Sequence, residues 1–100
     1  MKIQEKSRIL SEVGKRIRFA REKMGFRRQT EFGRDLGGFT LDQISRAERG
    51  DNWPPHDLLL ALARVGINLN YLFTGNGSLW SDSPQSVKLE GGQIAEIVAG

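Results

Sequence analysis

Glycines divide this chain into short segments, and this division constrains its fold more than any other feature of the sequence. Between the glycines, apolar residues recur every three or four positions, the spacing that gathers side chains on one face of an α-helix. Glycine adopts a positive φ without strain, so it commonly stands just after the end of a helix. The dividing positions are Gly25, Gly37, Gly38, Gly50, Gly66 and Gly75. The sequence therefore predicts an all-α fold of five helices.

Capping residues and prolines indicate where the expected helices begin and end. Thr40 is a good N-cap, because its hydroxyl accepts a hydrogen bond from a backbone amide of the first turn. Gly33 lies inside the second helix at a cost of about 1 kcal/mol, which indicates that another backbone passes close to it. The expected helices are Ser11–Met24, Gln29–Leu36, the stretch between Thr40 and Gly50, His56–Val65 and Leu69–Phe73. The fourth is apolar around most of its circumference and is expected to form the centre of the core.

One domain with two flanking segments is expected. A chain of 100 residues suffices for one modest core and not for two. Residues 1–10 are predicted to be an N-terminal arm or an extension of the first helix, and the polar stretch Met1–Ser7 favours an arm or a frayed end. Residues 11–75 form the predicted domain. Residues 76–100 are expected to be a linker and a short apolar tail, in which Leu79 and Trp80 are candidates for a dimer contact.

The composition narrows the classes of function. The chain has no cysteine and one histidine, which argues against disulfides, cysteine-based metal sites and paired-histidine mechanisms. The sequence shows no catalytic triad, phosphate-binding glycine loop or metal-ligand set, so we expect no enzymatic activity and no cofactor. It also has no apolar run of the roughly 20 residues that span a bilayer. A cytoplasmic protein without a membrane partner is expected.

Positive charge is concentrated in the first half of the chain. Residues 1–51 carry 13 Lys and Arg against 8 Asp and Glu, whereas residues 52–100 carry 2 against 4. A basic face of this kind suits a polyanion such as nucleic acid. A solvated charged helix explains the charge alone at least as well. The interpretation therefore depends on the residue pattern of 29–50.

Residues 29–50 follow the design of a helix-turn-helix: a helix that contains a glycine, a glycine turn and a capped second helix. In that design the second helix lies in the DNA major groove. Ile44 and Ala47 are expected to face the core, which leaves Thr40, Leu41, Asp42, Ser45 and Arg46 directed outward. Arg46 is a candidate for a base or phosphate contact, and an ion pair with Asp42 is the alternative. Asp42 itself is suited either to accept from a cytosine amino group or to hold Arg46 in position.

The string QISRAERG, at Gln43–Gly50, resembles the helix-turn-helix of the Cro/lambda-repressor-like family, also called the xenobiotic-response-element type. The resemblance continues through Pro55 and Gly66 to INLNYLFTG, at Ile67–Gly75, which is similar to the closing helix of phage repressors. It implies a compact five-helix domain that binds double-stranded DNA as a dimer. The loop that contains Arg27 and Arg28, and the turn at Gly37 and Gly38, are each one residue longer than is usual in the family.

The resemblance also implies roles for further residues. In the family, a glutamine at the position of Gln29 meets a DNA phosphate. After Gly50 the family often carries basic or polar phosphate contacts, and this chain departs from that pattern with Asp51, Asn52, Trp53 and Pro54. For Arg49 a phosphate contact and an ion pair with a carboxylate are equal alternatives, and Glu48 is expected to be structural. The full set of candidate DNA-binding residues is Arg27, Arg28, Gln29, Thr40, Leu41, Asp42, Ser45, Arg46, Arg49 and Asn52.

These observations predict a sequence-specific transcriptional regulator, of the phage or prophage repressor type, that reads a palindromic operator as a homodimer. The alternative is an antitoxin or protein-interaction module that binds a toxin and uses the same domain for autoregulation. The final residues Ala99 and Gly100 resemble the bond that is cut in self-cleaving repressors. On that reading the chain is the amino-terminal part of a protein with a further dimerisation domain.

Overall fold

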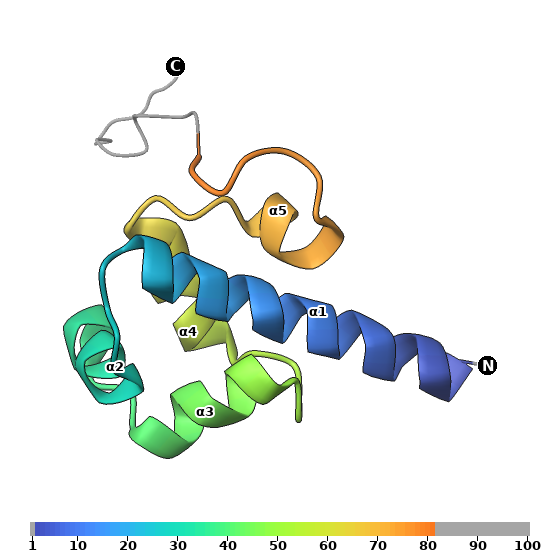
Figure 1. Ribbon diagram of the computed structural model, residues 1–100, viewed down its shortest axis with the longest axis horizontal. Helices are drawn as coiled ribbons and strands as arrows, with labels where there is room; N and C mark the ends of the chain where they lie inside the picture. The colour runs from blue at the N-terminus through green and yellow to red at the C-terminus, as the bar shows by residue number, and fades with distance from the viewer. Residues whose placement is uncertain (1, 82–100) are drawn as a thin grey trace.

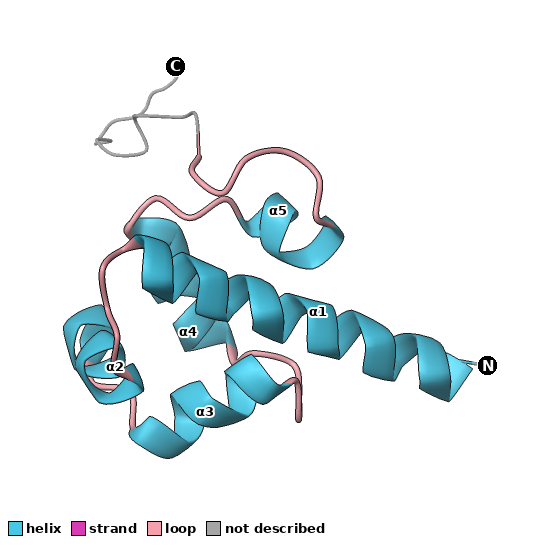
Figure 2. Cartoon of the chain, viewed as in Figure 1, coloured by secondary structure: helices cyan, strands magenta, loops and turns pink. Residues whose placement is uncertain are grey.

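The computed structural model describes residues 2–81, which contain one long helix and four short helices. They are α1 (Lys2–Lys23), α2 (Gln29–Gly37), α3 (Leu41–Arg49), α4 (His56–Arg64) and α5 (Leu69–Thr74), as Figure 1 shows. Within this range only loops connect them, apart from an isolated antiparallel bridge between Ile67 and Trp80 (Figure 2). The expected all-α fold with five helices is confirmed. None of these helices combines the length and the apolar character that crossing a membrane requires.

Of the two alternatives for the start of the chain, an arm or an extension of the first helix, the structure shows the extension from Lys2 onward. α1 starts at Lys2, so Lys2–Ser7 continues the helix and does not form the expected arm. This stretch is mostly polar, but its Lys, Glu and Gln residues are good helix formers, and Glu5 in the first turn interacts favourably with the helix dipole. The packed part of α1, which includes Leu10, Val13 and Ile17, provides a nucleus from which the helix extends toward its amino terminus. The amino-terminal end of α1 projects beyond the other helices (Figure 1).

The core is arranged around α1, which packs against α3 and α5. The α4 helix is less central than its apolar sequence indicated. Leu58 and Leu62 of α4 are fully buried, but Leu60 is 50% exposed. The neighbours of α4 are α2 and α5, and they leave part of its apolar circumference at the surface. The buried core residues contributed by the other segments are Val13, Ile17, Ala20, Phe32, Ile44, Ala47, Ile67, Leu72 and Leu79.

Residues 76–81, the beginning of the expected linker, pack against the helices. Leu79 is only 9% exposed and belongs to the core, so it is not available for the dimer contact suggested by the sequence. The backbone amide of Asn68 donates to the carbonyl of Leu79 at 2.8 Å, and the amide of Ser81 donates to the carbonyl of Gly66 at 2.7 Å. Trp80 remains 44% exposed. The remainder of the expected linker and tail lies outside the described residues.

We predict that Leu79→Ala lowers the free energy of unfolding by about 2–4 kcal/mol, because it removes a buried side chain and leaves a cavity. Leu60→Ala deletes the same atoms from an exposed position, so its effect should stay within about 0.5 kcal/mol. Urea unfolding followed by circular dichroism measures both values. Equal effects of the two substitutions would show that residues 76–81 do not contribute to the folded core.

Candidate functional site

The turn between α2 and α3 holds these two helices at a close approach. Gly38, in the left-handed region at φ 89°, ends α2, and the amide of Phe39 donates to the carbonyl of Gly33 at 2.9 Å. A Cβ atom on Gly33 would lie 2.4 Å from the carbonyl oxygen of Phe39. The close backbone approach predicted at Gly33 is confirmed. No larger residue fits there without moving α3 relative to α2.

The start of α3 is fixed by a capping box. The Thr40 hydroxyl accepts from the amide of Gln43 at 3.1 Å, and the Gln43 side chain accepts from the amide of Thr40 at 2.8 Å. The predicted N-cap role of Thr40 is therefore confirmed. This reciprocal pair satisfies two backbone donors that have no partner within the helix. The first turn of α3 is thereby ordered at its exposed end.

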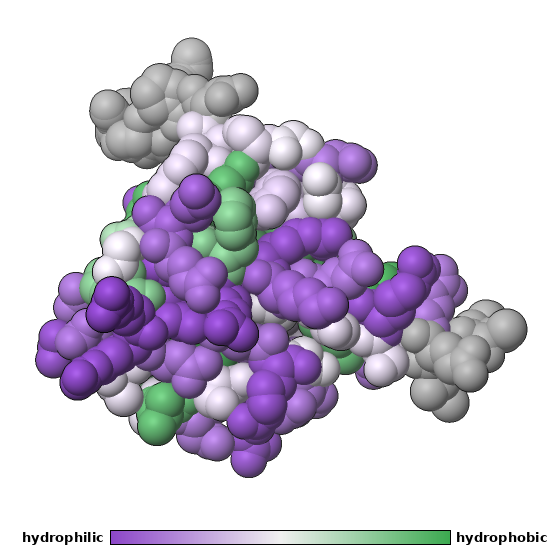
Figure 3. Space-filling view, in the orientation of Figure 1, coloured by the Kyte–Doolittle hydropathy of each residue, from purple (hydrophilic) through white to green (hydrophobic). Residues whose placement is uncertain are grey.

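The α3 helix has one buried and one outward face. Ile44 and Ala47 are buried, as expected. The lower part of the molecule, where α2 and α3 lie, is covered mainly by hydrophilic side chains (Figure 3). The outward residues of α3 are Leu41, Asp42, Ser45, Arg46 and Arg49, of which only Ser45 is partly buried. The structure thus gathers the candidates of α3 on one surface, which also includes Thr40.

Arg46 forms a single ion pair on this surface. Its Nε lies 2.9 Å from Oδ2 of Asp42, one turn earlier on the helix. Both side chains are well exposed, so the pair contributes at most about 1 kcal/mol to stability. Within the described residues, the Nη1 and Nη2 atoms of Arg46 have no partner. The expected alternative of an Asp42–Arg46 pair is observed, and it leaves the outer edge of the guanidinium open.

Arg49 differs, because all three of its guanidinium nitrogens are engaged. Nε and Nη2 donate to Oδ2 of Asp51 at 3.1 and 2.7 Å, and Nη1 donates to the hydroxyl of Ser45 at 2.8 Å. The hydrogen bonds that Arg49 donates to Asp51, and the negative charge of that carboxylate, raise the pKa of Arg49 above its ordinary value. Of the two alternatives for Arg49, the structure contains the ion pair.

A buried ion pair ties α3 to α1. Nε of Arg21 donates to Oε2 of Glu48 at 2.7 Å, Nη2 donates to Oε1 at 3.2 Å, and only 6% and 5% of the two side chains are exposed. Nη1 of Arg21 donates to the carbonyls of Phe26 and Arg27. The side-chain amide of Gln29 donates to Oε1 of Glu48 at 2.9 Å. The structural role expected for Glu48 is confirmed, and Gln29 joins the same network.

Arg21 is the residue of this network that was not singled out from the sequence. A signal was nevertheless present. Arg21 follows Ile17 by four positions and precedes Met24 by three, so it falls on the apolar stripe of the helix. Glu48 likewise follows the buried Ile44 by four positions. Two opposite charges placed on buried faces of two helices are a pattern that favours a buried pair.

The remaining candidates lie at the edges of this surface. Arg27 and Arg28 are exposed in the loop before α2, and Arg28 occupies the N-cap position without a capping side chain. Asn52 is exposed beyond the end of α3. It lines a hollow of about 130 Å³ together with Gln43, Arg46, Ala47, Trp53 and Pro55. The candidate residues therefore lie in the loop before α2, at the start of α2, on the outward face of α3 and in the loop after it.

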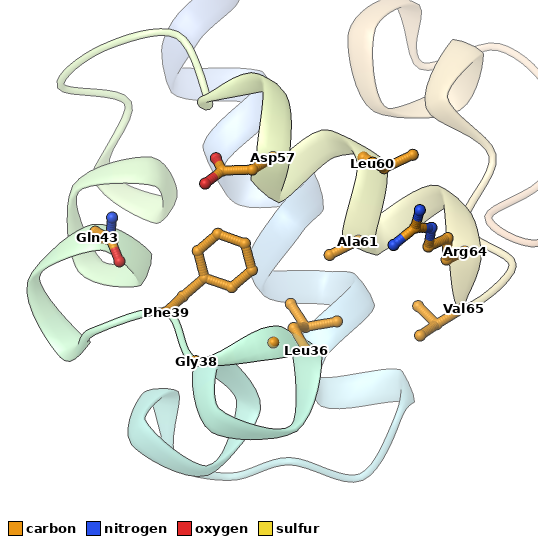
Figure 4. Close-up of a pocket in the computed structure, with 10 residues that line it drawn as sticks. Leu36, Gly38, Phe39, Gln43, Asp57, Leu60, Ala61, Arg64 and Val65 are labelled. Atoms are coloured by element: carbon orange, nitrogen blue, oxygen red, sulfur yellow. The ribbon is translucent and has the colours of Figure 1, made fainter.

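A larger hollow, of about 360 Å³, lies between the α2–α3 turn and α4. Figure 4 shows that Phe39 from the turn faces this space opposite α4, which contributes Asp57, Ala61 and Arg64. The residues that line it include no serine, threonine, histidine or lysine. Among the described residues, no group of three or more His, Asp or Glu side chains is placed to hold a metal ion. The candidate DNA-binding residues lie elsewhere, on the outward face of α3 and around the start of α2.

Comparisons of the chain with protein-family models, with curated proteins and with solved structures found no match.

We predict that Glu48→Gln lowers the free energy of unfolding by roughly 3 kcal/mol, because it leaves the buried guanidinium of Arg21 without its counter-charge. Glu22→Gln is the matched control, since it breaks the exposed pair between Arg18 and Glu22 and should change stability by less than about 1 kcal/mol. Thermal or urea unfolding of both variants checks the difference. A loss no larger than that of the control would contradict a structural role for the pair.

Proposed function

We propose that this protein is a sequence-specific regulator that binds double-stranded DNA, in which α2, the turn and α3 act as a helix-turn-helix. The observation that carries the proposal is the outward face of α3, where the open guanidinium edge of Arg46 stands on a helix fixed from behind by a buried ion pair. A helix of this diameter fits the major groove, and base edges there are read by side chains on such a face. Repression of transcription through an operator is the activity we propose.

Contacts to the DNA backbone are assigned to the start of α2. The first amides of a helix have no partner within it, and together with the helix dipole they favour an anion. Arg27 and Arg28 precede these amides and are exposed. Between Lys15 and Arg28 the sequence has seven Lys and Arg against one Glu. Arg21 is buried with Glu48, and the exposed cations of this segment supply the positive field that attracts a polyanion.

A homodimer is part of the proposal. Two copies related by a two-fold axis would read a palindromic operator whose half-site centres are separated by one helical turn, about 34 Å. Selection of bound duplexes from a random pool reveals the half-site and its symmetry. An asymmetric single site would contradict the dimer while leaving DNA binding intact.

DNA binding should depend steeply on salt, because neutralised phosphates release counterions. If a dimer neutralises roughly 6–10 phosphates, the affinity should fall about 10³- to 10⁵-fold between about 50 and 200 mM salt. Fluorescence anisotropy with labelled duplex DNA measures this dependence. A flat salt response would remove nucleic acid from consideration as the partner.

Arg46→Ala and Arg28→Ala should affect binding in different ways. Loss of Arg46 should weaken binding to the selected duplex by about 1–3 kcal/mol relative to scrambled DNA, because two hydrogen bonds to a guanine edge are lost. Loss of Arg28 should weaken binding to all sequences alike and reduce the salt dependence by about one counterion. Paired titrations with selected and scrambled duplexes separate the two. If Arg46→Ala weakens both equally, Arg46 contacts phosphate and not a base.

A further inference from the structure

The two arginines on the outward face of α3 are held in different ways. Asp51 and Ser45 occupy all three guanidinium nitrogens of Arg49. Arg46 forms an ion pair with Asp42, in which its Nε lies 2.9 Å from Oδ2, and within the described residues its guanidinium donates no hydrogen bond. Arg49 would have to break its hydrogen bonds before it contacted another molecule. The Nη1 and Nη2 donors of Arg46, in contrast, are unused within the described residues.

We propose that Asp42 is a positioning residue that orients Arg46 toward the N7 and O6 acceptors of a guanine; this inference rests on the function proposed above. A guanidinium is planar, so the ion-pair contact of the Asp42 carboxylate at Nε holds one edge of that plane toward the preceding turn of the helix. The remaining edge, with Nη1 and Nη2, then has the fork geometry that matches two acceptors on one base. Arg46 therefore needs little ordering when it binds, which favours affinity for the matching base.

The same carboxylate disfavours phosphate. Non-specific binding arises from attraction between cationic side chains and the DNA backbone. A phosphate brought to the open edge of Arg46 would approach the negative charge of Asp42, whereas the guanine edge is neutral and does not meet this repulsion. Asp42 thus favours guanine over phosphate at Arg46 in two ways, by orientation and by charge.

Arg49 does not share this role. Because Asp51 and Ser45 satisfy its donors, Arg49 holds the end of α3 to the following loop and reads no base. Arg49→Ala should therefore leave the base preference unchanged, in contrast to Arg46→Ala. A loss of preference at any base position in Arg49→Ala would contradict this assignment.

Asp42→Asn tests the proposal, with Asp42→Glu and Asp35→Asn as companions. Glutamate retains the charge and can still pair with Arg46 one turn later on the helix. Asp35→Asn removes one exposed negative charge from α2, so it reproduces the change in net charge without touching Arg46. Each variant is selected against a random duplex pool and then titrated with the selected and a scrambled duplex. Circular dichroism melting verifies that the variants remain folded.

The expected result is that Asp42→Asn lowers the ratio of selected to scrambled affinity roughly tenfold and weakens the preference for one guanine in the half-site. Its binding to scrambled DNA should tighten. Asp42→Glu should retain most of the ratio, and Asp35→Asn should leave it unchanged. If Asp42→Asn and Asp35→Asn shift both affinities by the same factor, Asp42 acts only through net charge and the proposal is wrong. If the unsubstituted protein binds neither duplex in a salt-dependent manner, the proposed function itself fails.

Discussion

The buried pair between Arg21 and Glu48 sets the position of α3, on which the candidate site depends. Burial of two charges is costly, and it is offset only where good geometry and further hydrogen bonds satisfy both groups. Both groups are satisfied, because Arg21 reaches two carboxylate oxygens and two loop carbonyls, while Glu48 also accepts from Gln29. A single network thereby joins α1, the loop before α2, the start of α2 and the second half of α3. It fixes both the rotation of α3 and the course of the loop that carries Arg27 and Arg28.

Close backbone contacts restrain α3 as well. A Cβ atom on Gly14 of α1 would lie 2.3 Å from the carbonyl oxygen of Glu48, and one on Gly50 would lie 2.7 Å from the carbonyl oxygen of Leu10. With the contact at Gly33, backbone meets backbone just before α3 begins and around its carboxyl end. Contacts of this kind leave few alternative arrangements for the helix. A rigid platform of this kind reduces the ordering cost of binding another molecule.

Local sequence rules predicted most of the fold and part of the site. The positions of the glycines predicted the five helices, and Thr40 predicted the N-cap of α3. Gly33 predicted the close approach of another backbone to α2. Each of these features depends on residues that are near in the sequence. The position of Leu79 was not predictable, since its burial depends on the chain reversing after α5 and forming the bridge between Ile67 and Trp80. The start of α1 stayed open between an arm and a helix extension, because helix extension from a packed segment needs no apolar periodicity. Exposed ion pairs such as Asp42–Arg46 could only be predicted as one of two alternatives.

The charges of the candidate site separate into two groups with different properties. On the outward face of α3 and the loop after it, Arg46 and Arg49 are each balanced by a carboxylate, Asp42 and Asp51 respectively. This face therefore has almost no net charge and attracts a polyanion weakly at long range. The excess positive charge lies instead between Lys15 and Arg28. Arg16, Arg18 and Arg21 of that segment are paired with carboxylates, so within the described residues the cations of the segment without an ion pair are Lys15, Lys23, Arg27 and Arg28. In the proposed function, attraction to DNA would come from that segment and discrimination among sequences from α3, so affinity and specificity can change independently by substitution.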